Sequence, residues 1–151
     1  MGLGILAGLF ISIGATLCLL VVTGSAMGVG PTRLLGGVVF SLGLMLVILT
    51  GAELSTGNCL LVIPWARGRL TTVALLRNWG FSFLANCFGA VLFVMLVAKS
   101  GLLDSGELQQ TAKRVADAKL ALEPVPAFVR GVLCNLLVCL GARPLCLGGG
   151  A

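Results

Sequence analysis

The chain has 151 residues, of which 58% are hydrophobic and only 10% are charged, and its mean hydropathy is +1.13. A soluble domain of this length needs more charge to cover its surface, so the composition is that of an integral membrane protein whose main partner is the lipid bilayer. The net charge of +5 comes from Lys and Arg residues near the ends of apolar segments. A nucleic-acid-binding protein gathers such residues on one face with aromatic residues between them, so nucleic acid is excluded as a partner.

Most of the six cysteines lie inside apolar runs, where cysteine behaves as a small hydrophobic residue. The sequence has no C-x-x-C pair and no histidine. We therefore expect no metal and no cofactor. Without a nucleophile–base pair, we also expect no enzyme activity.

The apolar runs predict three spans in residues 1–98, taken as the first unit of the chain. Residues 3–23 carry no charge and are long enough to cross a bilayer, since about 20 residues rise about 30 Å. No Lys or Arg precedes this run, which favours a true span over a signal peptide. A second span is predicted over residues 34–65 with an interruption at residues 50–58, and a third over residues 78–98.

The rest of the chain divides into a charged connector and the start of a fourth span. Residues 99–126 are mixed in charge and helix-prone, which predicts an extramembrane helix or loop. Residues 127–140 are apolar and predict the beginning of a span, whereas residues 141–151 are expected to be an aberrant tail. By the positive-inside rule, the arginines of the 66–77 loop place that loop and the N-terminus in the cytoplasm.

The stretch TGAELSTGN, residues 50–58, places a carboxylate and small polar residues between two apolar runs. Backbone that leaves a helix at mid-membrane depth must be satisfied by protein or water, so the interruption predicts a buried cavity or pore. A second half-helix is expected to begin near Asn58, and its N-terminus would attract a small anion. Its expected capping side chains are those of Ser55, Thr56 and Asn58.

Gly51 and Gly57 are expected to permit the turn at the interruption. Two roles stay open for Glu53. The favoured role is structural, with the carboxylate accepting hydrogen bonds from free backbone N–H groups of the break. The other is a relay for protons or ions. The structural role is favoured because a naked carboxylate on a pore wall would repel the anions that the helix end attracts.

Phe40 and Leu44 lie four residues apart before the break, and Leu54 lies within it. These three side chains are candidates for an apolar constriction, although ordinary packing explains the spacing equally well. Two glycine pairs have the GxxxG spacing of helix contacts, a weak signal in a glycine-rich chain: Gly4 with Gly8, and Gly24 with Gly28. Residues 6–12 also resemble residues 129–135, as in the inverted repeats of many transporters.

Three motifs resemble the formate/nitrite transporter family, in order and with fitting spacing. GAELSTGN resembles the signature of that family at a broken helix, LLRNWGFSFLANCFGA resembles its next helix, and FVRGVLCNLLVCL resembles the opening of its fourth helix. The resemblance covers most of residues 6–140. It implies an all-α membrane protein with an aquaporin-like, inverted-repeat helical bundle, a broken second helix and, in this chain, an incomplete second repeat.

The resemblance also implies a function and a set of site residues. Members of this family assemble as pentamers with one pore per protomer and conduct small monovalent anions such as formate or nitrite, often with a proton. The resemblance places Glu53, Gly57 and Asn58 in support of the break, and Lys119 resembles a vestibule lysine that helps to draw the anion in. The implied pore residues are Phe40, Leu44, Leu54, Ser55, Thr56 and Asn135.

Three departures from the family pattern change the expectation for this chain. Ser55 stands where the family usually has phenylalanine, so a looser inner gate is expected. The second broken helix with its central histidine is absent, and so is the sixth helix. We therefore expect a truncated transporter of the plasma membrane that is inactive by itself. The alternative is a non-conducting subunit that assembles with full-length relatives rather than as a homopentamer.

Overall fold

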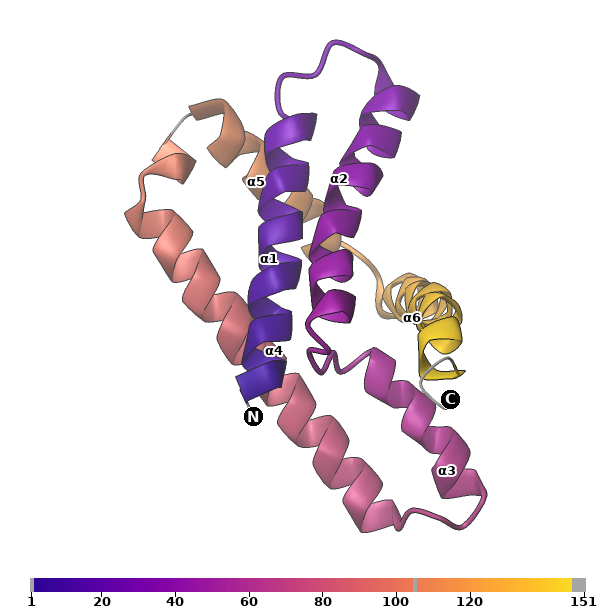
Figure 1. Ribbon diagram of the computed structural model, residues 1–151. Coiled ribbons are helices and arrows are strands. Elements are labelled where there is room, and N and C mark those ends of the chain that lie inside the picture. The colour runs from indigo at the N-terminus through magenta and orange to yellow at the C-terminus, as the bar shows by residue number, and fades with distance from the viewer. Residues whose placement is uncertain (1, 105, 148–151) are drawn as a thin grey trace.

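The computed structural model describes residues 2–104 and 106–147, and the regular structure in this part of the chain is entirely helical. Three helices are long and apolar enough to cross a membrane: α1 (Gly2–Val22), α2 (Val29–Leu49) and α4 (Thr72–Lys99). Helix α1 packs along both α2 and α4 (Figure 1). The three predicted spans are therefore present as helices.

Helix α4 begins earlier than predicted because Thr71 caps it. The Thr71 hydroxyl accepts a hydrogen bond from the N–H of Ala74 at 3.3 Å, which satisfies one of the free donors of the first turn. The indole N–H of Trp65 donates to the Thr72 hydroxyl at 3.1 Å and fixes the preceding loop. Arg77, expected in that loop, therefore lies on the helix.

Glycines allow α1 to approach its two neighbours closely. A methyl group added at Gly14 would lie 2.8 Å from the Phe40 carbonyl oxygen, and Gly43 opposite is equally crowded. On the other side of α1, a methyl group at Gly8 would collide with the backbone of Asn86. Small residues at such crossings give membrane helices their packing contacts, so these glycines fix how α1, α2 and α4 fit together.

The two glycine pairs with GxxxG spacing have different roles. Gly4 and Gly8 both face α4, so this pair marks a true helix contact. Gly24 and Gly28 have φ angles of +67° and +79° and lie in the turn between α1 and α2. Glycine adopts these angles without strain, so the second pair serves the turn and not helix packing.

Beyond α4 the predicted connector contains a short turn and a helix, and its place outside the membrane stays a prediction. A short turn, η2 (Leu102–Asp104), leads into α5 (Gly106–Leu120), which packs against α1. Leu108 of α5 is only 3% exposed, whereas the charged residues of this helix are exposed. Helix α5 is therefore amphipathic, as expected for a segment outside the hydrocarbon region.

Helix α6 (Pro124–Leu147) follows α5 after a bend of 109°. It begins before residue 127 and continues past residue 140, so helical backbone extends into the segment expected to be an aberrant tail. Residues 148–151 of that segment lie outside the described residues. Figure 1 shows α6 apart from the α1–α2 pair, and it meets the rest of the described chain chiefly at the break in the second span.

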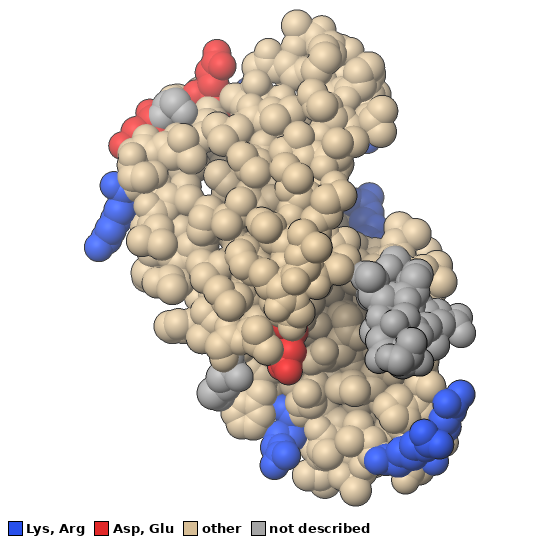
Figure 2. All heavy atoms as spheres, in the orientation of Figure 1, with Lys and Arg blue, Asp and Glu red and all other residues tan. Residues whose placement is uncertain are grey.

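The surface agrees with a chain embedded in a bilayer. Figure 2 shows that uncharged atoms cover most of the middle of the visible face, and that Lys and Arg side chains gather at the end where α3 (Val62–Ala66) and α4 are joined. Large apolar side chains are exposed along the spans; Phe83 and Met95 of α4, for example, are 59% and 60% exposed. Such side chains suit contact with lipid rather than water.

Candidate functional site

The second span breaks where predicted, because Gly51 ends α2. Gly51 has a φ of +63°, and its N–H donates to the Ile48 carbonyl at 3.1 Å. The N–H of Ala52 donates to the Val47 carbonyl at 2.9 Å. This left-handed glycine motif satisfies free carbonyls at a helix end. Gly57 does not have a positive φ and begins the next helical turn, so only Gly51 uses the left-handed conformation that glycine permits.

The second half-helix begins at Gly57, next to the predicted Asn58. It consists of a tight turn, η1 (Gly57–Leu61), followed by α3 (Val62–Ala66). The expected side-chain caps are wrong. Thr56 occupies the position before the first turn, but its side chain makes no capping hydrogen bond, and neither Ser55 nor Asn58 replaces it. The side chain of Asn58 is instead directed to α4.

Asn86 of α4 holds the break in place. Its Nδ2 donates to the Glu53 carbonyl at 2.9 Å and to the Gly4 carbonyl at 2.8 Å. Its Oδ1 accepts from the Ser55 N–H at 2.9 Å. One side chain thereby links α1, the break and α4. Because each unsatisfied backbone group inside a bilayer costs several kcal/mol, these bonds make an irregular segment possible at this depth.

A second set of bonds from α4 anchors the start of η1. The Asn58 Nδ2 donates to the Asn78 Oδ1 at 2.9 Å and to the Ser82 hydroxyl at 2.7 Å. The Trp79 indole N–H donates to the Asn58 carbonyl at 2.9 Å. Ser82 is only 4% exposed, so this contact is shielded from the surroundings. The break is therefore fixed to α4 on both sides of Thr56.

Sequence reasoning did not assign roles to these α4 residues, although a signal was present. Asn78, Ser82 and Asn86 recur at every fourth position and so lie on one face of an otherwise apolar helix. A polar side chain inside a membrane helix generally faces a protein partner rather than lipid. The spacing could thus have predicted a polar segment packed against α4.

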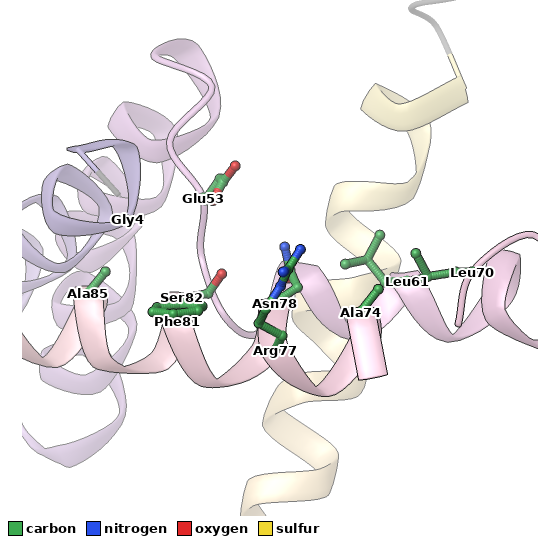
Figure 3. Close-up of a pocket in the computed structure, with 10 residues that line it drawn as sticks. All are labelled: Gly4, Glu53, Leu61, Leu70, Ala74, Arg77, Asn78, Phe81, Ser82 and Ala85. Atoms are coloured by element: carbon green, nitrogen blue, oxygen red, sulfur yellow. The ribbon is translucent and has the colours of Figure 1, made fainter. Parts of the chain in front are cut away.

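The Glu53 carboxylate does not have the predicted structural role. It accepts no hydrogen bond from the described residues, and the Ser55 N–H of the break donates to Asn86 instead. Glu53 instead lines an open pocket of about 380 Å³ between the break and α4, together with Arg77 and Ser82. Figure 3 shows its side chain directed away from α4. The alternative relay role stays a prediction.

Thr56 and Asn135 both lie at the junction of η1 with α6. The Cys139 thiol donates to the Thr56 carbonyl at 3.6 Å, so one face of α6 lies against the break. Asn135 is one helical turn before Cys139 and lies on the same face. Thr56 Oγ1 and Asn135 Oδ1 are buried, and neither has a hydrogen-bond partner among the described residues. Because buried polar atoms are normally paired, this junction suits water or a small polar molecule.

The remaining site predictions are placed on their elements but not tested by a contact. Phe40, 39% exposed, and Leu44, half-buried, lie in the last three turns of α2. Leu54 is half-buried within the break, next to Ser55 and Thr56. Lys119 is exposed in the last turn of α5. The apolar constriction and the lysine vestibule therefore stay predictions.

The chain matches a family model described as formate/nitrite transporter over residues 1–145. It is 39% identical over 141 residues to the formate channel FocA of Escherichia coli (strain K12), in a match that covers 91% of this chain and 50% of FocA. It is 36% identical over 157 residues to a probable formate transporter of Methanothermobacter thermautotrophicus, covering 91% of this chain and 57% of that protein. The chain spans about half the length of the curated relatives that it matches.

A solved structure, a pentameric formate channel with formate bound, matches with a TM-score of 0.76 and 36% sequence identity. The match covers 91% of this chain and 55% of that chain. The family match reaches residue 145, beyond the residues 6–140 on which the resemblance was based. Helix α6 likewise continues to Leu147.

Proposed function

Because the chain belongs to the formate/nitrite transporter family, we propose that it forms one half of a pathway for small monovalent anions across a membrane. It is an integral, multi-pass membrane protein of the aquaporin-like fold and not an enzyme. The observation that carries the proposal is the break between α2 and α3. Its backbone is fixed by Asn86, while Thr56 Oγ1 is left buried and unpaired.

The junction of η1 with α6 supplies groups for a small carboxylic acid or its anion. The Thr56 hydroxyl can donate a hydrogen bond to a carboxylate oxygen, whereas Asn135 Oδ1 can only accept one. A protonated acid, or an anion accompanied by water, offers both the acceptor and the donor that these atoms need. An unpaired anion is also costly in apolar surroundings. We therefore propose that flux is linked to protons.

We further propose that this chain conducts nothing by itself. It has no histidine, and the described residues hold one broken helix, whereas an inverted repeat places a second one across the pore. The junction at Thr56 would then face lipid or an open space. The completed protomer is proposed to form a pentamer in the plasma membrane, with the basic loop before α4 and the N-terminus in the cytoplasm.

Formate uptake into liposomes tests this proposal. Two proteins are reconstituted beside FocA as the positive control: this chain alone, and a chimera in which its residues 1–140 replace the matching half of FocA. The chimera is expected to take up formate, faster as the external pH falls, while the chain alone matches empty vesicles. A folded chimera that takes up no formate would contradict the proposal that this chain forms one half of a pathway. Uptake by the chain alone would contradict its inactivity.

A second candidate function is a non-conducting subunit that assembles with full-length relatives. The unpaired Thr56 Oγ1 and Asn135 Oδ1 favour it, because a helix of a neighbouring protein could supply their missing partners. Co-reconstitution with FocA separates the two candidates. A subunit would copurify with FocA and lower its formate flux, whereas a chain that serves only as half of a separate pathway would do neither.

A further inference from the structure

Two thiols from distant parts of the chain lie against the same turn of the break. The Cys59 thiol of η1 donates to the Ser55 carbonyl at 3.8 Å, and the Cys139 thiol of α6 donates to the Thr56 carbonyl at 3.6 Å. Because Ser55 and Thr56 are consecutive, their carbonyls bring the two sulfur atoms into one neighbourhood. Both thiols are free and partly buried.

The other described cysteines do not share this arrangement. Cys87 and Cys134 are exposed, and Cys18 lies against Gly36 of α2. Cys134 is useful as a reference because it lies on the same helix as Cys139, less than two turns away. The pairing of Cys59 with Cys139 is therefore a feature of the fold and not of the high cysteine content.

We propose that Cys59 and Cys139 form a two-thiol site that binds one thiophilic divalent metal ion, of which Hg²⁺ is the probe, between α6 and the break. Soft thiolate ligands select soft metal ions. Each thiol releases its proton to water, and each sulfur donates an electron pair to the metal, so that two sulfur–metal bonds form and nothing is oxidised. Two thiolates neutralise a divalent ion, which avoids the cost of leaving a net charge in partly buried, apolar surroundings.

Occupation of this site would join α6 to η1 beside Thr56 and Asn135. The bridge would hold together two elements that otherwise meet through few contacts. The site needs neither an anion nor a completed pore, so it stands independently of the proposed transport function. Sequence reasoning expected no metal, because no spacing motif connects the two cysteines.

The test uses the full chain in detergent with four cysteines replaced by serine (Cys18, Cys87, Cys134 and Cys146), which leaves only the proposed pair. The control keeps Cys59 and Cys134 and carries Cys139→Ser in addition to the other replacements. Each protein receives one equivalent of HgCl₂ and is then challenged with increasing β-mercaptoethanol. Bound mercury is measured by mass spectrometry after gel filtration.

The proposed pair is expected to retain one Hg²⁺ per chain at a competitor concentration about 100-fold higher than the control does, because two linked thiols act at high effective concentration. Equal retention by the control would overturn the proposal. So would mercury that links two chains, which gel filtration detects as a dimer. Circular dichroism establishes that both variants are folded.

A measurement on the unaltered chain covers the case in which the serine variants do not fold. The chain is loaded with HgCl₂, treated with a maleimide and mapped by peptide mass spectrometry. We expect Cys59 and Cys139 to be protected together, while Cys87 and Cys134 are labelled. Protection of either thiol without the other would contradict a shared site.

Discussion

The break contacts two helices in opposite ways. Against α4, the Nδ2 groups of Asn86 and Asn58 each donate two hydrogen bonds, and Asn86 Oδ1 accepts one. Against α6, Thr56 Oγ1 and Asn135 Oδ1 are buried without a partner. Paired polar atoms hold the backbone rigid, whereas unpaired buried atoms are available to a passing molecule. We therefore propose that the α4 side is the scaffold and that the α6 side faces the permeant of the proposed pathway.

The largest effect is expected where α1 meets the scaffold. Gly8→Val places a side chain against the Asn86 backbone and should lower stability by about 3 kcal/mol, since overpacking forces the helices apart. The control is Gly131→Val on α6, where an added methyl group meets nothing within 4 Å. Thermal unfolding in detergent micelles measures both variants. Equal melting temperatures would mean that α1 and α4 are not closely packed.

The next largest effect is expected from a substitution that removes the link between α4 and the break. Asn86→Leu leaves the Ser55 N–H and the carbonyls of Glu53 and Gly4 without their partner, and should cost about 2 kcal/mol of stability. The neighbouring exchange Cys87→Ala, at an exposed position, is the control. Unfolding in detergent should separate the two variants. A stable Asn86→Leu chain with unchanged hydrogen exchange at the break would contradict the scaffold role.

Asn135→Leu tests the other side of the comparison. Because Asn135 Oδ1 has no partner to lose, the stability of the chain should change by less than about 0.5 kcal/mol. In the chimera with FocA, however, formate uptake should fall about tenfold, or about 1.4 kcal/mol in barrier height, because a polar contact for the permeant is lost. The opposite pattern, a destabilised chain with normal uptake, would make Asn135 structural.

The smallest effect is expected at the exposed end of α5. Lys119→Ala in the chimera should leave stability unchanged and lower formate uptake about twofold at low salt, since an exposed charge attracts anions only weakly and is screened by ions. Lys113→Ala, on the same helix, is the matched control. If the two variants have the same uptake at every salt concentration, Lys119 has no special place in the vestibule.

Local features of the fold could be predicted from the sequence. Long uncharged runs predict spans because bilayer thickness fixes their length, and Gly51 predicts the end of α2 because glycine accepts a left-handed turn. The position of the break, and Thr56 within it, follow from the same signals. The prediction of Asn135 as a pore residue came from a family motif, not from a physical argument.

Features that depend on distant contacts could not be predicted in this way. The capping side chains were wrongly predicted because the N–H groups of Asn58 and Cys59 donate to the backbone carbonyls of Leu54 and Thr56. The Asn58 side chain is drawn to α4, far along the chain. The meeting of Cys59 with Cys139 depends on how α6 turns back onto the break, and no sequence spacing encodes that approach.

The most direct test of the central claim is the reactivity of a thiol placed at the break. The chimera with FocA is freed of its other cysteines and carries Thr56→Cys, and a water-soluble, membrane-impermeant thiol reagent is added to liposomes. We predict that the reagent modifies the new thiol, that formate slows the reaction, and that modification stops formate uptake. A folded chimera that does not react, or that keeps its uptake after modification, would contradict the claim that the break faces the permeation pathway.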